Sequence, residues 1–214
     1  MIAEKPAQTK VPIHPLLAER WSGRAFSARD VSRDEVHMLL EAARWSPSSA
    51  NEQPWRLVVV RREEPTHAAV VASLTGSNVH WAGRAPILLV MAASTTMEKS
   101  GKPNRYAWHD VGVATGMLVV QATALGLATH ILAGWAPEAL RAAVAIPAGF
   151  DPVTVIAIGH RAEADTLPED LRVRELAPRT RRPLDEVAFS ERFGEPCMHE
   201  VSPAAAHPTG KEEP

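Results

Sequence analysis

The chain has 214 residues, of which 45% are hydrophobic and 22% are charged, a composition that supports a sizeable globular core. Its formal net charge of -2 excludes a protein-wide positive field that would attract nucleic acid or an anionic membrane. The single cysteine, Cys197, cannot form an intrachain disulfide, and no apolar stretch is long enough to span a bilayer. The polar N-terminal residues lack the apolar core of a signal peptide, so we expect a cytoplasmic protein without nucleic-acid or membrane partners.

The sequence indicates one folded domain, at residues 13–193. Residues 1–12 are polar and contain prolines, which predicts a flexible N-terminal arm. Residues 194–214 combine prolines and charges without apolar periodicity, which predicts a tail that is disordered or lies on the surface. We find no internal repeat and no linker that would divide the region between them.

The predicted elements combine helices with short apolar strands. A capping box that starts at Ser32 opens a helix that Pro47 ends. The longest helical signal has Val113 and Met117 at helical spacing, and Gly126 can end it. In chain order, we expect helices at 14–21, 32–46, 66–74, 105–125 and 137–144, and strands at 57–60, 86–93, 128–133 and 153–158. This pattern predicts a helix-rich fold, α+β or mixed α/β, around one apolar sheet.

The first candidate for chemistry is the segment Arg20-Trp21-Ser22-Gly23-Arg24, which lies between two predicted helices. Its two guanidinium groups and its hydroxyl can bind phosphate or a delocalised oxyanion, because arginine offers paired, planar donors. Gly23 allows the backbone to turn or to approach a ligand closely. The same composition also suits a solvated basic turn, so this segment alone leaves both interpretations open.

The second candidate is the loop from Pro47 to Trp55, between a helix end and a buried strand. It is dense in hydroxyl and amide groups, which can satisfy the edge of a heteroaromatic ring or a polyol chain without charge. Its prolines restrict the loop, so less conformational entropy is lost when a ligand binds. An ordinary helix–strand loop made of turn-forming residues is the alternative interpretation.

The third candidate is a run of arginines shortly before Pro183 and Leu184. Its density exceeds what a solvated face requires, so it could bind phosphate, and a basic surface segment is the alternative. The run contains Arg172, Arg174, Arg179, Arg181 and Arg182.

Other features carry less weight. Gly112 and Gly116 do not follow a strand and form no dinucleotide fingerprint, and their spacing favours close helix packing, for instance across a subunit interface. The nine histidines show no metal-ligand spacing, so we expect no metal site. We expect His109 and Asp110 to point to different faces of their helix, and no side chain has the context of a catalytic nucleophile.

Taken together and in this order, the segments resemble the nitroreductase family of FMN-dependent oxidoreductases over roughly residues 13–190. The resemblance rests on an Arg-x-Ser-x-Arg element, a Pro-Ser-x-x-Asn-x-Gln-Pro-Trp loop, an Asp-x-Gly in a long helix, a strand that ends in Gly-His, and an Arg-x-Arg before Pro-Leu. These elements are Arg20, Ser22 and Arg24; Pro47, Ser48, Asn51, Gln53, Pro54 and Trp55; Asp110 and Gly112; Gly159 and His160; and Arg179 and Arg181. Each element alone is common, whereas their joint order is specific.

The resemblance implies an α+β fold with a central, mainly antiparallel sheet flanked by helices. It also implies a homodimer that has a long central helix at its interface and holds FMN there. Arg20 and Arg181 would bind the phosphate, with Arg179 nearby, and Arg24 would lie at the N1–O2 edge of the isoalloxazine. Further implied contacts are Trp21 and Ser22; Pro47, Ser48 and Ser49, contributed by the partner subunit; and Asn51, Gln53, Asn78, Ala133 and Gly134.

The implied activity is that of an NAD(P)H:acceptor oxidoreductase in which the flavin carries the reaction. NADH or NADPH would transfer hydride to flavin N5, and a small-molecule acceptor such as a nitroaromatic or a quinone would then bind at the same face in a ping-pong cycle. Arg24 would stabilise the negative charge that spreads over N1 and O2, so no catalytic side chain is required. The alternatives are a flavoenzyme of this fold that oxidises or rearranges a specific metabolite, and an FMN-binding protein with little turnover.

Overall fold

Four strands form one sheet in the order β1-β2-β4-β3, and every neighbouring pair is antiparallel. The computed structural model describes residues 2–197, so most of the tail predicted at 194–214 lies outside the described residues. The strands are β1 (Trp55–Arg61), β2 (Ile87–Ser94), β3 (Ala128–Leu132) and β4 (Phe150–Gly159). All four predicted strands are present, and the antiparallel sheet with its helices confirms the α+β fold.

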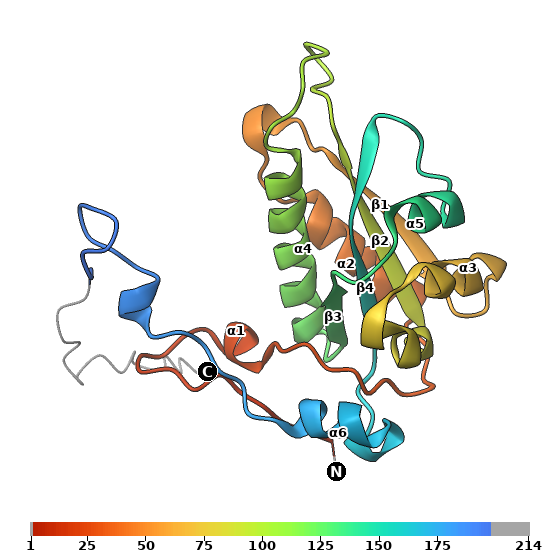
Figure 1. Ribbon diagram of the computed structural model, residues 1–214, viewed down its shortest axis with the longest axis vertical. Helices are drawn as coiled ribbons and strands as arrows, with labels where there is room; N and C mark the ends of the chain where they lie inside the picture. The colour runs from red at the N-terminus through yellow and green to blue at the C-terminus, as the bar shows by residue number, and fades with distance from the viewer. Residues whose placement is uncertain (1, 198–214) are drawn as a thin grey trace, which may run out of the picture.

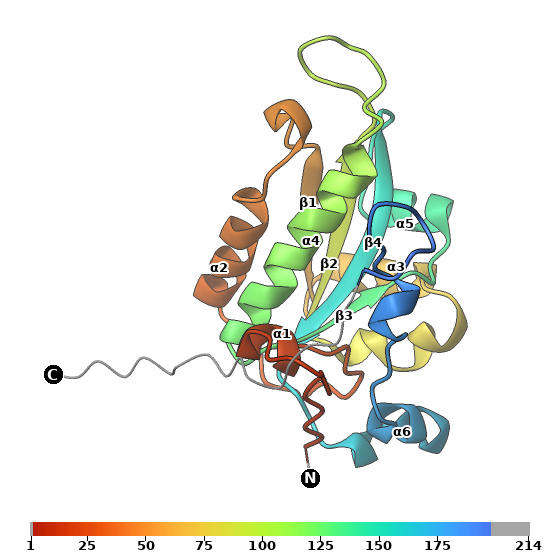
Figure 2. The ribbon, with the colours of Figure 1, turned by 90° about the vertical axis from the view of Figure 1, so that its left-hand side faces the viewer.

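Helices cover both faces of this sheet (Figure 1, Figure 2). One face carries α2 (Arg33–Arg44) and α4 (Ala107–Ala124), and the other carries α3 (Pro65–Ser73) and α5 (Pro137–Ala143). Two further helices, α1 (Pro15–Glu19) and α6 (Glu169–Leu176), lie near the end of the molecule where α4 ends (Figure 1). The 3₁₀ turns are Ser49–Asn51, Gly76–His80, Ala82–Arg84, Ala164–Thr166 and Leu184–Glu186. The sequence pattern predicted the α-helices α1 to α5 and missed α6.

Strand β2 separates two hydrophobic cores because its side chains alternate between the two faces of the sheet. Ile87, Leu89 and Met91 belong to the core under α2 and α4. Leu88 and Val90 belong to the core under α3 and α5. The strand is therefore buried on both faces, which explains its continuous apolar sequence.

Two helix boundaries follow directly from capping residues. The Ser32 N–H donates to the Glu35 carboxylate at 2.7 Å, and the Glu35 N–H donates to the Ser32 hydroxyl at 3.1 Å, so both bonds of the predicted capping box form. Helix α4 is followed by Gly126, which has a φ of 70° and whose N–H donates to the Thr123 carbonyl. This left-handed conformation suits glycine, and it ends the helix as predicted.

Helix α4 is apolar on its outer face as well as on its inner face. Val111 and Leu118 point into the core, whereas Met117 is 47% exposed and Trp108 is 53% exposed. The stripe that indicated this helix, through Val113 and Met117, is therefore not the buried one. Among residues 2–197, no helix combines the length and the apolarity that a membrane span requires.

Gly159 ends β4 where the strand passes the ring of Pro86. A Cβ atom on Gly159 would lie 2.5 Å from Pro86 Cδ and 3.0 Å from Phe26 Cδ1, closer than packed atoms approach. We expect Gly159→Ala to lower the free energy of unfolding by about 1–3 kcal/mol, because the rigid proline ring cannot rotate away. Urea unfolding measures the loss. Pro86→Ala in the same chain should recover part of it, and full stability of Gly159→Ala alone would contradict the overlap.

Candidate functional site

The first candidate segment, at residues 20–24, runs extended beside β3, and Ser22 forms a parallel bridge with Thr129. Successive side chains of an extended segment point to opposite sides. The half-buried side carries Arg20, Ser22 and Arg24, and the buried side carries Trp21, Gly23 and Ala25. The Arg-x-Ser-x-Arg spacing therefore places its three polar side chains on one surface, which we call the arginine surface.

Trp21 points away from the arginine surface. Its residue is 4% exposed, and its ring has Lys5 Nζ at 4.6 Å and the guanidinium carbon of Arg161 at 5.0 Å from the ring centroid. Two cations against one ring give cation–π contacts that hold the N-terminal arm to the domain. The Trp21 side chain therefore does not face the surface where a cofactor contact was predicted for it.

Arg20 lies among other guanidinium groups. Burial lowers the pKa of Arg20, and the charges of Arg179, Arg181 and Arg161 lower it further. Like charges held together in this way are stabilised by a bound anion. Nη1 of Arg179 also donates to the carbonyls of Lys5 and Ala18 at 2.7 and 2.6 Å. The structure thus brings together the three arginines that the sequence predicts for a phosphate.

Arg24 has the imidazole of His130, on β3, as a neighbour. His130 Nδ1 lies 3.1 Å from the Gly23 carbonyl oxygen, a hydrogen bond that requires a proton on Nδ1. Burial and the charge of Arg24 lower the pKa of His130 to about 4, against the opposing effect of the Gly23 and Ser22 carbonyls. The histidine ring also packs on Trp81, with 4.6 Å between ring centroids. Arg24 therefore carries its positive charge beside a neutral imidazole.

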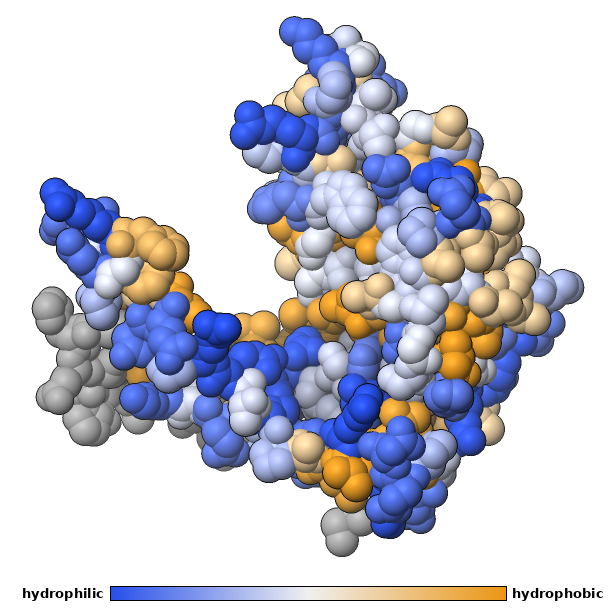
Figure 3. All heavy atoms as spheres, viewed as in Figure 1, coloured by the Kyte–Doolittle hydropathy of each residue, from blue (hydrophilic) through white to orange (hydrophobic). Residues whose placement is uncertain are grey.

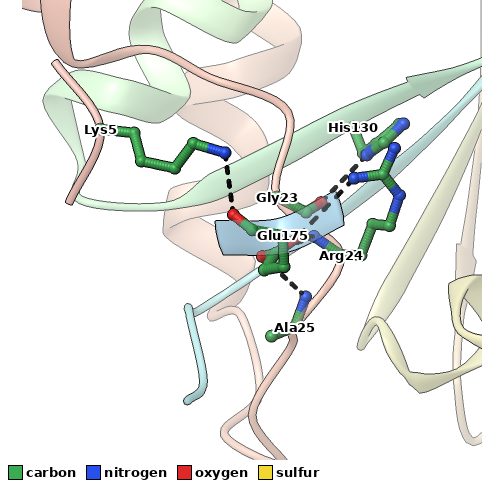
Figure 4. Close-up of polar contacts among 6 residues, drawn as sticks. All are labelled: Lys5, Gly23, Arg24, Ala25, His130 and Glu175. Carbon is green, nitrogen blue, oxygen red and sulfur yellow. Dashed lines mark hydrogen bonds and ion pairs between the residues drawn. The ribbon is translucent and has the colours of Figure 1, made fainter. Parts of the chain in front are cut away.

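A carboxylate from α6 holds the backbone behind the arginine surface (Figure 4). Glu175 is 3% exposed and accepts the N–H of Arg24 at 2.9 and 3.0 Å and that of Ala25 at 3.3 Å. One carboxylate oxygen also lies 3.8 Å from Nη1 of Arg24. Neither Glu175 nor His130 stands in a sequence motif, so the sequence predicts no role for them.

The predicted Ala133 and Gly134 directly follow β3, and the predicted Asn78, from the 3₁₀ turn Gly76–His80, contacts Gly134. Nδ2 of Asn78 donates to the Gly134 carbonyl at 3.2 Å, and the Thr75 N–H donates to the same carbonyl at 2.9 Å. A Cβ atom on Gly134 would lie 2.7 Å from Nδ2 of Asn78, so glycine permits this close approach. Ala133 is exposed beside it.

The second candidate segment, the polar loop at 47–55, is held at the start of α4. The Ser49 N–H donates to the carboxylate of Asp110 at 3.0 Å, and the Ser48 hydroxyl accepts the N–H of Gln53 at 3.0 Å. Asp110 is 2% exposed, and its other carboxylate oxygen lies 2.9 Å from Nδ1 of His109. The expectation that His109 and Asp110 point apart is therefore wrong, because the exposed imidazole folds back onto the carboxylate.

The polar loop contains backbone strain. Ala50, Asn51 and Gln53 have φ angles of 52°, 57° and 47°, in the left-handed region that side chains disfavour. Such strain collects at functional sites, where the surrounding structure holds it in place. The loop therefore presents its amide and hydroxyl groups in one fixed conformation.

The arginine surface and the polar loop lie at opposite ends of α4 (Figure 1, Figure 2). Asp110 in the first turn of the helix anchors the loop, whereas the arginine surface runs beside β3, which follows the helix. A helix of 18 residues is about 27 Å long. One chain therefore does not bring both segments to the same small molecule.

Comparisons with known proteins agree with this architecture. The model of the nitroreductase family matches residues 17–72 and 63–160. A solved oxidoreductase containing FMN is 33% identical, with a TM-score of 0.84, and the match covers 91% of this chain and 100% of that one. The NADH dehydrogenase of Thermus thermophilus is 26% identical over 68% of this chain and 84% of its own length. The FMN reductase [NAD(P)H] of Bacillus subtilis is 23% identical over 69% of this chain and 65% of its own. The chain belongs to the nitroreductase family.

Proposed function

We propose that the chain is an FMN-dependent NAD(P)H:acceptor oxidoreductase that binds its cofactor between two copies of itself. The observation that carries the proposal is the arginine surface. At one end of it Arg20 lies among other guanidinium groups, and at the other Arg24 lies beside the neutral imidazole of His130. One relative contains FMN, and two others are named for NADH and for NAD(P)H-dependent FMN reduction. The single cysteine suits the reducing cytoplasm, where we propose that the enzyme works.

The residues present fit the two ends of FMN. Arg20, with Arg179 and Arg181 beside it, offers charged planar donors to the phosphate. When bound, FMN supplies hydride transfer through N5, with negative charge spread over N1 and O2. Arg24, fixed through its backbone N–H, would stabilise that charge without reorganising, and the Ala133–Gly134 backbone would face N5.

A dimer through α4 would complete the site. Gly112 and Gly116 lie on the exposed face of the helix, and Cβ atoms on them would meet nothing within 4 Å. Each glycine costs a helix about 1 kcal/mol relative to alanine, so packing within the chain does not explain them. A second α4 in close contact would explain them, together with the exposed Trp108 and Met117. An antiparallel pair would bring the partner subunit's polar loop, with its Pro47–Ser49 stretch, to the arginine surface of the first subunit.

The C-terminal segment supports the same assembly. After α6 the chain extends away from the sheet and its helices, and it borders a hollow beside the outer face of α4 (Figure 1, Figure 3). Leu184, Val187 and Phe193 of this segment are 54%, 56% and 94% exposed. Large apolar side chains on such an extension would be covered if it lay along a second subunit.

Absorption spectra test the proposed activity. The purified chain should take up FMN, and NADH or NADPH should bleach its flavin band without oxygen. An acceptor panel of nitroaromatics and quinones should then restore the band. A protein that takes up no FMN overturns the proposal, and failure of both nucleotides to bleach the flavin would favour an FMN-binding protein with little turnover. Reoxidation by neither acceptor class would favour a flavoenzyme for a specific metabolite.

The two arginines of the arginine surface should differ in effect. We expect Arg20→Ala to weaken FMN binding about 10–100-fold, because it removes charged hydrogen bonds to the phosphate. Arg24→Ala should slow flavin reduction by NAD(P)H about 10–100-fold with a smaller loss of affinity. Fluorescence titration and anaerobic stopped-flow absorbance measure the two properties. If both variants change both properties equally, the division of roles is wrong.

The proposed dimer predicts that a larger side chain on the outer face of α4 separates the two subunits. Gly116→Leu should convert a dimer to a monomer and release FMN, although the single chain has room for the side chain. Light scattering after size-exclusion chromatography measures the mass. Ala69→Leu adds comparable bulk to an exposed position of α3, on the other face of the sheet, and should leave the dimer intact. A Gly116→Leu dimer that retains FMN would contradict this interface.

The neutral state of His130 predicts a pH dependence of stability. The pKa of His130 is about 4 in the folded chain and 6.5 for an ordinary histidine, so protonation favours the unfolded state. Above about pH 6.5, His130 is neutral in both states and its burial does not oppose folding. As the pH falls from 6.5 toward 4, the unfolded chain takes up the proton first, so the free energy of unfolding decreases. Between pH 7 and pH 5, the wild type should lose about 1–2 kcal/mol more than His130→Gln, whose amide can still donate to Gly23. Urea unfolding at both pH values measures this difference, and equal losses would contradict it.

A further inference from the structure

We infer that Glu175 is a positioning residue that sets the reduction potential of the bound cofactor, by fixing Arg24 and offsetting part of its charge. The inference rests on the proposed function, because it concerns the same site. Glu175 lies on α6, behind the arginine surface, and it would act on the cofactor through Arg24, whose backbone N–H it accepts (Figure 4).

The carboxylate fixes the backbone on which Arg24 stands. Both of its oxygens accept the Arg24 N–H, and one also accepts the N–H of Ala25. A Cβ atom on Gly23 would lie 3.2 Å from Oε1 of Glu175, so the carboxylate reaches these groups because residue 23 is glycine. The fourth position of the Arg-x-Ser-x-Arg element, Gly23, thus has a physical role of its own.

The same carboxylate balances the charge of Arg24 without occupying its donors. The separation of 3.8 Å from Nη1 of Arg24 is longer than a hydrogen bond, so the guanidinium can still bind a ligand. Glu175 raises the pKa of Arg24, whereas burial and Arg174 lower it. The two charges therefore interact, while the guanidinium faces the surface.

Other charges surround Glu175 and keep its burial tolerable. Lys5 Nζ donates to the Glu175 carbonyl at 2.8 Å, and the pKa of Lys5 is lowered by burial and raised by Glu175. Burial lowers the pKa of Arg161, and the nearby charge of Glu175 opposes that shift. A buried carboxylate is costly unless cations and N–H donors compensate it, and here both do.

The sign of the effect follows from the charges. Reduction of the cofactor places negative charge near Arg24, and the negative charge of Glu175 opposes it. Neutralising Glu175 should therefore favour the reduced form over the oxidised form. A residue that only supports the fold would weaken the binding of both forms equally and leave the potential unchanged.

Glu175→Gln tests the inference, because it removes the charge and keeps the shape. We expect the affinity for reduced FMN relative to oxidised FMN to rise about tenfold, which is a shift of about 30 mV to more positive potential for a two-electron couple. Equilibration with a reference dye gives the potential, and fluorescence titration gives the affinity for oxidised FMN. Glu169→Gln makes the same charge change on an exposed, Arg172-paired position of α6 and should change the ratio less than twofold. An unchanged or more negative potential in Glu175→Gln overturns the inference.

Gly23→Ala provides an independent test if Glu175→Gln does not fold. Its methyl group would push the carboxylate away from the Arg24 N–H without removing charge. The potential should shift in the same direction by a smaller amount, about two- to threefold in relative affinity, and no positive shift overturns the inference. A wild-type chain that binds no FMN would overturn the proposed function itself, whereas normal binding with unshifted variants would overturn this inference alone.

Discussion

Two buried carboxylates hold the arginine surface and the polar loop by their backbone N–H groups. Glu175 accepts from Arg24 and Ala25, and Asp110 accepts from Ser49. Neither segment belongs to the four-stranded sheet, so its buried donors need partners of another kind. Charge-assisted bonds to a carboxylate are stronger than neutral ones, and they fix the backbone while leaving the side chains free to meet a ligand.

Helix α4 then sets the distance between these two anchored segments. Its inner face closes a hydrophobic core, and its outer face carries glycines and exposed apolar side chains. Because the helix separates the polar loop from the arginine surface, a single chain would hold two half-sites of the proposed cofactor site. The proposed antiparallel dimer joins each half-site to the complementary one, which yields two equivalent sites by symmetry.

The sequence predicts local structure here better than it predicts orientation. Capping at Ser32 and the glycine at 126 locate helix boundaries, because those signals act within a few residues. Which face of α4 is buried is harder to predict, because both faces are apolar. The helical spacing of Val113 and Met117 follows the outer face, although the same spacing is typical of a buried face. The apolar pattern of a helix does not predict which of two apolar faces packs in the core and which a partner subunit covers.

The site shows the same limit. The family resemblance implies that Arg20 and Arg181 bind a phosphate with Arg179 nearby, and in the structure the charges of Arg179 and Arg181 act on Arg20. Glu175 could not be predicted, because it is one charged residue in a short charged helix, and its role depends on contacts 150 residues away along the chain. The pKa of His130 likewise falls to about 4 through burial and the charge of the nearby Arg24, contacts that the sequence does not reveal.

The two positive charges of the proposed site, on Arg20 and Arg24, have different electrostatic surroundings. Arg20 is surrounded by other guanidinium groups, which suits tight binding of a phosphate whose charge does not change during the reaction. Arg24 has a carboxylate behind it and a neutral imidazole beside it. An uncompensated cation there would favour the reduced cofactor strongly and would slow its oxidation by an acceptor, because stabilising one state of a cycle too far raises the barrier to leaving it. A partly offset cation stabilises the charge that forms on reduction and still allows the electrons to pass on.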